Sequence, residues 1–375
     1  MFKNNITLFS ILGFKIRINI SWIIIAVLIT WSLSTGFFPY YYEGLSTTQY
    51  WIMGVIGAIG LFASILFHEL WHSIIARHYG LPISGITLFL FGGVSEMVEE
   101  PKTPKIEFLM AVAGPLSSLV LGFALYGIAQ GAETIGISPL VTGIIGYLAI
   151  INWIFAVFNM LPAFPLDGGR VLRSALWHYK GDLRWATNIA SKAGSFFGIL
   201  LMIFGLVNLF TGNPIGGMWY FIIGLFLKSA AQMSYQQVMI KQNLKGETVS
   251  SLMRTDPITV SPDISVKELV EKYIYRHHFK MYPVVENGNL LGCVHMSRIK
   301  EIDREEWESR NVRELAMNCS EENTVSPEED VTDAMTRMNR TGNSRLMVVE
   351  NGKLKGILAQ KDIMGYLSTR MEMEG

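Results

Sequence analysis

The chain has 375 residues, of which 50% are hydrophobic and 17% are charged, which excludes a purely soluble protein and indicates a membrane protein with a soluble domain. Its 31 basic residues balance 31 acidic ones and no basic tract stands out, so nucleic acid is not an expected partner. Two cysteines, Cys293 and Cys319, are too few for a disulfide framework or a cysteine-rich zinc site, which fits a reducing cytoplasmic setting.

Hydropathy divides the chain into two predicted domains. Long apolar runs dominate residues 1–240, whereas residues 241–375 carry dense charge with ordinary globular patterning. At roughly 20 apolar residues per crossing, the first domain should be a polytopic α-helical domain of about six spans in the lipid bilayer of the cell membrane. The predicted spans are residues 18–36, 50–77, 106–130, 139–160, 192–210 and 217–236.

Lysine and arginine residues mark one side of the predicted membrane domain. They lie before the first predicted span and after the second, fourth and sixth, whereas the alternate loops 37–49, 131–138 and 211–216 contain none. The positive-inside rule therefore predicts that both termini and the soluble domain are cytoplasmic.

The second predicted span contains His68-Glu69-Leu70-Trp71-His72, the HExxH signature of zinc proteases. Positions i and i+4 of a helix differ by about 40° of rotation, so both imidazoles face one side and can ligate one ion. The Glu69 carboxylate lies beside them, where it can accept a proton from an attacking water. Because unpaired polar groups are costly in hydrocarbon, this pattern in an apolar segment indicates peptide hydrolysis at membrane depth.

Two short segments have the character of strands rather than spans. Residues 14–20 alternate apolar and polar side chains, and residues 85–91, followed by Gly92 and Gly93, are typical of a β-hairpin. A strand edge beside an active site can bind an extended substrate through main-chain hydrogen bonds and hold it unwound. The alternative interpretation is a purely structural connector.

A catalytic zinc usually has three protein ligands and one open position, so the HExxH motif needs a third ligand. Residues 159–170 read Asn-Met-Leu-Pro-Ala-Phe-Pro-Leu-Asp-Gly-Gly-Arg, with two prolines that end a helix, a carboxylate, and two glycines that permit close backbone approach. Asp167 is the candidate ligand. The alternative is that Asp167 caps a cytosolic helix running from Gly169 to Tyr179.

These motifs together resemble the site-2 protease family of intramembrane metalloproteases. The resemblance rests on HExxH, the glycine-rich hairpin near Gly92, the Ala113-Gly114-Pro115-Leu116 run and the residue 159–170 segment, and it extends over most of residues 10–180. HExxH alone is shared with many soluble proteases. Its combination with the second motif in an apolar chain is specific.

The resemblance implies a role for each motif residue. In that family the aspartate of the second motif completes the zinc site, and the preceding asparagine helps to hold the substrate or its developing oxyanion. Carried over, His68, His72 and Asp167 bind one zinc ion per chain, Glu69 is the general base and Asn159 assists catalysis. The ligand set of two nitrogens and one oxygen also suits iron or cobalt, and zinc is favoured by the motif.

The charged half of the chain contains an internal repeat, predicted at about residues 248–302 and 312–370. The matching segments are Tyr282–Gly288 with Leu346–Gly352, and Thr259–Pro262 with Thr324–Pro327. Each unit is predicted to combine helices with a strand hairpin. This α+β pattern resembles a pair of cystathionine-β-synthase (CBS) domains.

CBS pairs often bind adenine nucleotides between their repeats, which implies a regulatory site in this chain. The ribose-binding aspartate of that family is matched by Asp362, although Ala359 replaces the customary Ser or Thr. The equivalent position in the first repeat is Arg298, so at most one nucleotide site is expected. The alternative is a structural or dimerising module, and a homodimer through the pair is an expected assembly.

The sequence therefore predicts a zinc-dependent intramembrane endopeptidase that cuts the transmembrane segment of a single-span membrane protein. One alternative is a CBS-gated transporter, which needs no Glu69 between its ligands and should have repeated or inverted spans. The second alternative is an inactive relative that binds membrane helices without cutting them.

Overall fold

The computed structural model describes residues 5–89, 92–97, 100–212 and 214–374. Contacts divide the chain into two compact units, Met1–Gln236 and Gln237–Gly375. This division lies within one helix, α8 (Pro214–Leu244), which also contains the predicted domain boundary after residue 240.

Within the described residues, five helical segments are long and apolar enough to cross a membrane. They are Ser21–Tyr41, which comprises α1 (Ser21–Ser32), the π-helical η1 (Leu33–Phe37) and α2 (Phe38–Tyr41), followed by α3 (Thr47–His78), α4 (Pro104–Thr134), α5 (Pro139–Asn159) and α7 (Leu183–Phe210). They correspond to the first five predicted spans. The sixth, residues 217–236, is helical within α8 but is not among the five, and Lys228 and Gln232 interrupt its apolar run.

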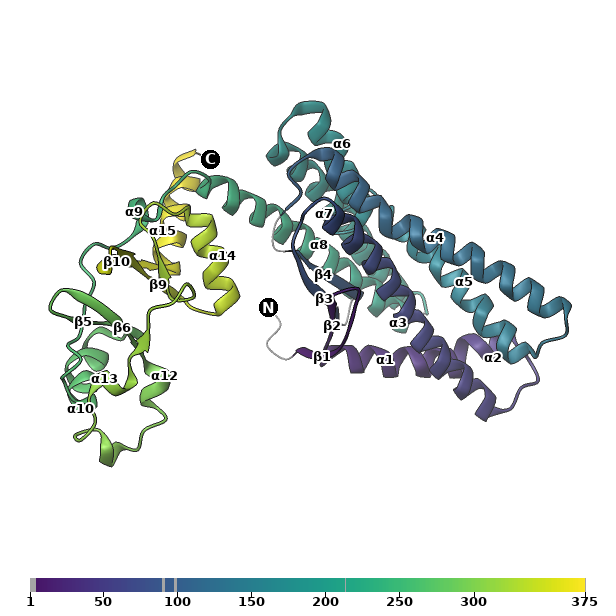
Figure 1. Cartoon of the computed structure of the whole chain (residues 1–375). Coiled ribbons are helices and arrows are strands. Elements are labelled where there is room, and N and C mark those ends of the chain that lie inside the picture. The colour runs from purple at the N-terminus through teal and green to yellow at the C-terminus, as the bar shows by residue number, and fades with distance from the viewer. Residues whose placement is uncertain (1–4, 90–91, 98–99, 213, 375) are drawn as a thin grey trace. The chain divides into compact units, whose positions relative to one another are not determined.

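A four-stranded sheet packs against α3 in the first unit (Figure 1). Its strands, in spatial order, are β1 (Asn5–Ile11), β2 (Phe14–Asn19), β3 (Ile83–Phe89) and β4 (Gly92–Met97). β2 and β3 pair in parallel and the other neighbours are antiparallel. The predicted strand at 14–20 and the predicted hairpin after residue 85 are confirmed, although the hairpin's turn lies outside the described residues.

Helix α6 (Asp167–Lys180) follows the loop after α5. Its first turn packs tightly on that loop: a Cβ at Gly168 would lie 2.3 Å from the Met160 carbonyl oxygen, and one at Gly169 would lie 2.4 Å from the Phe164 nitrogen. The predicted close backbone approach at these two glycines is confirmed.

The second unit contains two three-stranded sheets, each with flanking helices. Their strands are β5 (Met281–Glu286), β6 (Asn289–His295) and β7 (Met317–Asn318), then β8 (Thr324–Val325), β9 (Arg345–Glu350) and β10 (Lys353–Ala359). The helical segments are α9 (Val249–Leu252), α10 (Val266–Glu268), η2 (Leu269–Ile274), α11 (Tyr275–His277), α12 (Met296–Ile299), η3 (Arg304–Glu306), α13 (Val312–Leu315), α14 (Val331–Thr341) and α15 (Gln360–Glu374).

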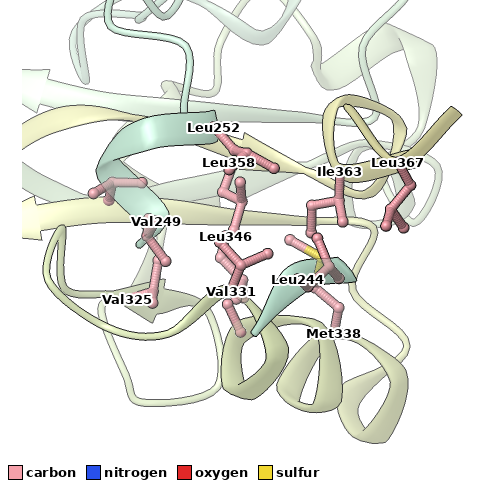
Figure 2. Close-up of a cluster of buried hydrophobic side chains, with 12 residues drawn as sticks. Leu244, Val249, Leu252, Val325, Val331, Met338, Leu346, Leu358, Ile363 and Leu367 are labelled. Atoms are coloured by element: carbon pink, nitrogen blue, oxygen red, sulfur yellow. The ribbon is translucent and has the colours of Figure 1, made fainter. Parts of the chain in front are cut away.

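The second repeat is built around an apolar core. Figure 2 shows Leu346 and Leu358 of the sheet gathered with Met338 of α14 and Ile363 of α15. Leu244, at the end of α8, is fully buried in the same cluster. The predicted α+β architecture of the soluble part is therefore confirmed, and the final turn of α8 belongs to its core.

Candidate metal centre

His68 and His72 lie on the same side of α3, as the i, i+4 spacing predicts. Both are buried, with exposed fractions of 5% and 6%, and their Nε2 atoms are 3.1 Å apart. Two ring nitrogens at this separation can serve as ligands of one ion.

The outer nitrogen of each imidazole is held by α4. The Nδ1 of His68 lies 2.9 Å from the Ser118 hydroxyl, and the Nδ1 of His72 donates to the Met110 carbonyl oxygen at 2.6 Å. A carbonyl only accepts hydrogen bonds, so the His72 Nδ1 carries a proton and its Nε2 is the ring nitrogen available to a metal ion. This outer bonding orients an imidazole as a metal ligand.

Asp167, the first residue of α6, completes the cluster. Its Oδ2 lies 3.1 Å from the His68 Nε2 and 3.2 Å from the His72 Nε2. Tetrahedral zinc with bonds of about 2.0–2.2 Å separates its ligand atoms by about 3.3 Å, so this triangle fits one ion with little movement. The N-cap of α6 is Leu166 rather than Asp167, which argues against the alternative of a capping role.

Gly114 on α4 lies directly against the ligand atoms. A Cβ at this position would be 2.1 Å from the His72 Nε2 and 2.5 Å from the His68 Nε2. Real Cβ contacts below 3.0 Å are essentially never seen, so any side chain here would displace a ligand. Gly114 belongs to the Ala113–Leu116 run, but the sequence of that run does not predict this steric role.

The carboxylate of Glu69 is oriented by the sheet. Its Oε2 accepts a hydrogen bond from the Ser95 hydroxyl of β4 at 2.8 Å. A Cβ at Gly93 would lie 2.7 Å from the Glu69 Cγ, so the glycine allows β4 to approach the motif. Ser95 could not be predicted from the sequence, because hairpin patterning does not show which residue faces the helix.

Asn159 is not joined to this cluster. It ends α5, is partly buried, and its side chain forms no hydrogen bond within the described part of the chain. Its predicted role toward the substrate therefore stays a prediction.

The predicted ribose-binding residue of the second unit is already engaged in an ion pair. Asp362, in the first turn of α15, accepts hydrogen bonds from the Nε and Nη2 of Arg254 at 2.9 and 2.7 Å. The guanidinium of Arg345 lies 4.3 Å above the ring of Phe279. Burial lowers the pKa of Arg345, and attraction to the Asp362 carboxylate opposes that shift. The Asp362 carboxylate, two arginine side chains and the Phe279 ring thus lie near one another, and they come from both repeats.

Two family models match the chain. The model described as Peptidase family M50 matches residues 56–136 and 127–204, which include the three ligand candidates. The CBS domain model matches residues 249–305 and 312–369, in register with the two predicted repeats.

Three curated relatives resemble nearly the whole chain. The zinc metalloprotease MJ0392 of Methanocaldococcus jannaschii is 32% identical over 365 residues, covering 97% of this chain and 96% of that protein. The candidate zinc metalloprotease Rip3 of Mycobacterium tuberculosis is 32% identical over 363 residues, covering 96% and 92%. The candidate zinc metalloprotease sll0528 of Synechocystis is 32% identical over 372 residues, covering 98% and 96%. Each alignment includes the membrane unit and the CBS pair.

Proposed function

Because the chain belongs to peptidase family M50, the site-2 proteases, and is a multi-pass membrane protein, we propose that it is a zinc-dependent intramembrane endopeptidase. Its substrates are membrane-bound proteins that it cuts within a transmembrane segment. The observation that carries the proposal is the buried triangle of two imidazole nitrogens and one carboxylate oxygen between apolar helices, with Glu69 beside it in sequence.

Each residue of the site has a chemical task. His68, His72 and Asp167 would hold the zinc ion, which would act as a Lewis acid toward the scissile carbonyl and make a bound water more acidic. Glu69 accepts a proton from the attacking water and returns it to the leaving amine, with Oε2 fixed by the Ser95 hydroxyl. We assign Asn159 to hydrogen bonding of the developing oxyanion.

The β4 edge supports a route for presenting the substrate. β4 is at one end of the four-stranded sheet, and its Ser95 contacts the general base. A substrate segment paired along β4 would lie extended beside Glu69, with its backbone hydrogen bonds supplied by the strand. The helical hydrogen bonds of a transmembrane substrate must open before a water can attack, and strand pairing stabilises the opened form.

The remaining assignments follow from charge distribution and the CBS pair. The lysine and arginine pattern supports a cytoplasmic location for both termini and for the CBS pair. We propose a single-span membrane protein as the substrate class and a homodimer formed through the CBS pair.

Metal removal tests the proposed centre. The purified full-length protein should contain one zinc ion per chain and should lose cleavage of a single-span substrate when a chelator removes the metal. Added zinc should restore cleavage, as measured on a gel with metal content determined in parallel. A metal-free protein that cleaves at the same rate would refute the centre.

We further propose that an adenine nucleotide binds the CBS pair and modulates the protease. A ribose diol would compete with Arg254 for the Asp362 carboxylate, because the Nε and Nη2 of Arg254 already donate to its Oδ1. Calorimetric titration with ATP and AMP should therefore show binding by the full chain that Asp362→Ala weakens at least about tenfold, the effect of one lost charge-assisted hydrogen bond. Asp333→Ala, on the exposed face of α14, is the control. Equal binding by both variants would exclude Asp362 from the site.

The two alternatives are less well supported. The similarity to named zinc metalloproteases over both units gives no support to a transporter. An inactive helix-binding relative would need no ordered carboxylate at Glu69, and the Ser95 hydrogen bond holds that carboxylate in place.

A further inference from the structure

A buried ion pair joins α4 to α6 close to the metal centre. Glu107 of α4 is fully buried, and Arg173 of α6 is 4% exposed. The Arg173 Nε donates to the Glu107 Oε1 at 2.6 Å, and its Nη2 contacts the same oxygen. Arg170 lies farther away, with its Nε 3.9 Å from that oxygen.

This pair is a poor source of stability. Removing two charges from water costs free energy that their attraction barely offsets, and replacing such a pair by apolar side chains is often neutral or stabilising. The second carboxylate oxygen of Glu107 has no hydrogen-bond partner in the described part of the chain, which adds to the cost. What the pair does provide is a fixed geometry between two helices.

The two helices carry different parts of the metal centre. Met110, one turn along α4 from Glu107, holds the His72 imidazole through its carbonyl oxygen, and Ser118 of the same helix holds His68. Asp167, the third ligand candidate, is the first residue of α6. The distance between the Asp167 carboxylate and the two imidazoles therefore depends on the position of α6 relative to α4.

Arg173 also contacts the loop that leads into α6. Its guanidinium carbon lies 5.0 Å from the centroid of the buried Phe164 ring, three residues before Asp167 in the chain. One side chain thus connects Glu107 on α4 with both the loop and the helix that position Asp167. A planar guanidinium can donate in two directions while stacking on a ring, which a lysine cannot do.

We propose that Glu107 and Arg173 are positioning residues that fix the Asp167 carboxylate at ligand distance from the two histidines. The inference rests on the proposed zinc site. Zinc bonds of about 2.0–2.2 Å tolerate little displacement of a ligand oxygen, so a small shift of α6 is enough to weaken metal binding.

The experiment measures metal binding and stability separately in the full-length protein. Zinc affinity is determined by competition with a chromophoric chelator. Ligand geometry is determined from the visible spectrum of the cobalt-substituted protein. Stability is determined from thermal unfolding of the metal-free form. The variants are Glu107→Gln, Arg173→Lys and the double apolar variant Glu107→Met/Arg173→Met. His178→Gln, at an exposed position near the end of the same helix, is the control.

The two single variants should bind zinc roughly 10- to 100-fold more weakly, the range found when partners behind metal ligands are lost, and should change the cobalt spectrum. His178→Gln should match the wild type. The double apolar variant removes both buried charges, so it should keep the thermal stability of the metal-free form without recovering zinc affinity.

Three results would overturn the inference. Unchanged zinc affinity in folded single variants would show that α6 keeps its position relative to α4 without the Glu107–Arg173 ion pair. Recovery of affinity together with stability in the double variant would mean that the pair has only a structural role. A wild type that binds no zinc would refute the proposed metal centre itself, so the two failures are distinguishable.

Discussion

Replacing Glu69 by glutamine is expected to lower peptide-bond cleavage by at least about 100-fold, because an amide cannot accept the proton of the attacking water. The general base of a hydrolase typically contributes a factor of about 10²–10⁴. Zinc content should stay at the wild-type level, since the proposed ligands are His68, His72 and Asp167. The measurement is the initial rate of cleavage of a purified single-span substrate, with metal content determined on the same samples.

The control for this substitution is Glu133→Gln, an exposed glutamate near the end of α4, which should cleave at the wild-type rate. If Glu69→Gln cleaves as fast as Glu133→Gln, another group is the base. If it cleaves slowly but has also lost zinc, the substitution has damaged the metal centre and the assignment fails as stated.

Gly114→Ala is expected to damage the metal centre strongly. The new Cβ would overlap the Nε2 atoms of both His68 and His72, and each ring is already held at its Nδ1 by α4. The rings cannot turn away without breaking those hydrogen bonds. Zinc affinity should fall at least about 100-fold, and the crowding should destabilise the fold by about 1–3 kcal/mol.

Gly127→Ala provides a matched control, because Gly127 is on the same helix and a Cβ there meets nothing within 4 Å. Alanine favours helix over glycine, so this variant should be at least as stable as the wild type and bind zinc normally. Competition with a chromophoric chelator and thermal unfolding compare the two variants. Normal zinc affinity in Gly114→Ala would contradict the close approach of α4 to the ligands.

The sequence predicts those parts of the site that depend on local spacing. His68 and His72 face one side of α3 because any helix brings i and i+4 together, and this needs no knowledge of the fold. The prolines and glycines around Asp167 also predict a helix break and a tight backbone approach, which the contacts of Gly168 and Gly169 confirm. That Asp167 meets the histidines came from the family resemblance, since no local rule joins residues almost 100 positions apart.

The groups that support the ligands were not predictable in the same way. Met110 contributes a backbone carbonyl, which every residue has, so its side chain carries no signal. Ser118 is fully buried in an apolar helix, and buried polar residues of this kind often have a function. Its neighbour Ser117 is also buried, but the Ser117 hydroxyl donates to the Gly114 carbonyl oxygen of the same helix, whereas the Ser118 hydroxyl contacts His68. Only the packing of α4 on α3 distinguishes the two serines.

Two features of the fold also escaped prediction. β1 was not foreseen because a register shift between Thr7 and Phe9 breaks its period-2 pattern, and because it pairs only as an edge strand. The ion pair between Arg254 and Asp362 joins residues from distant parts of the second unit, and composition does not predict such pairs. It means that the predicted ribose carboxylate is engaged before any nucleotide binds.

The position of the cut in the substrate shows whether the protease acts inside the membrane. Wild type and Glu69→Gln, each reconstituted in lipid vesicles with a single-span substrate, are compared by mass spectrometry of the products. The wild type alone should produce fragments whose new termini lie inside the transmembrane segment, and a zinc chelator should abolish them. Fragments with termini in the soluble flanks, or identical fragments from both proteins, would contradict an intramembrane protease built on His68, Glu69, His72 and Asp167.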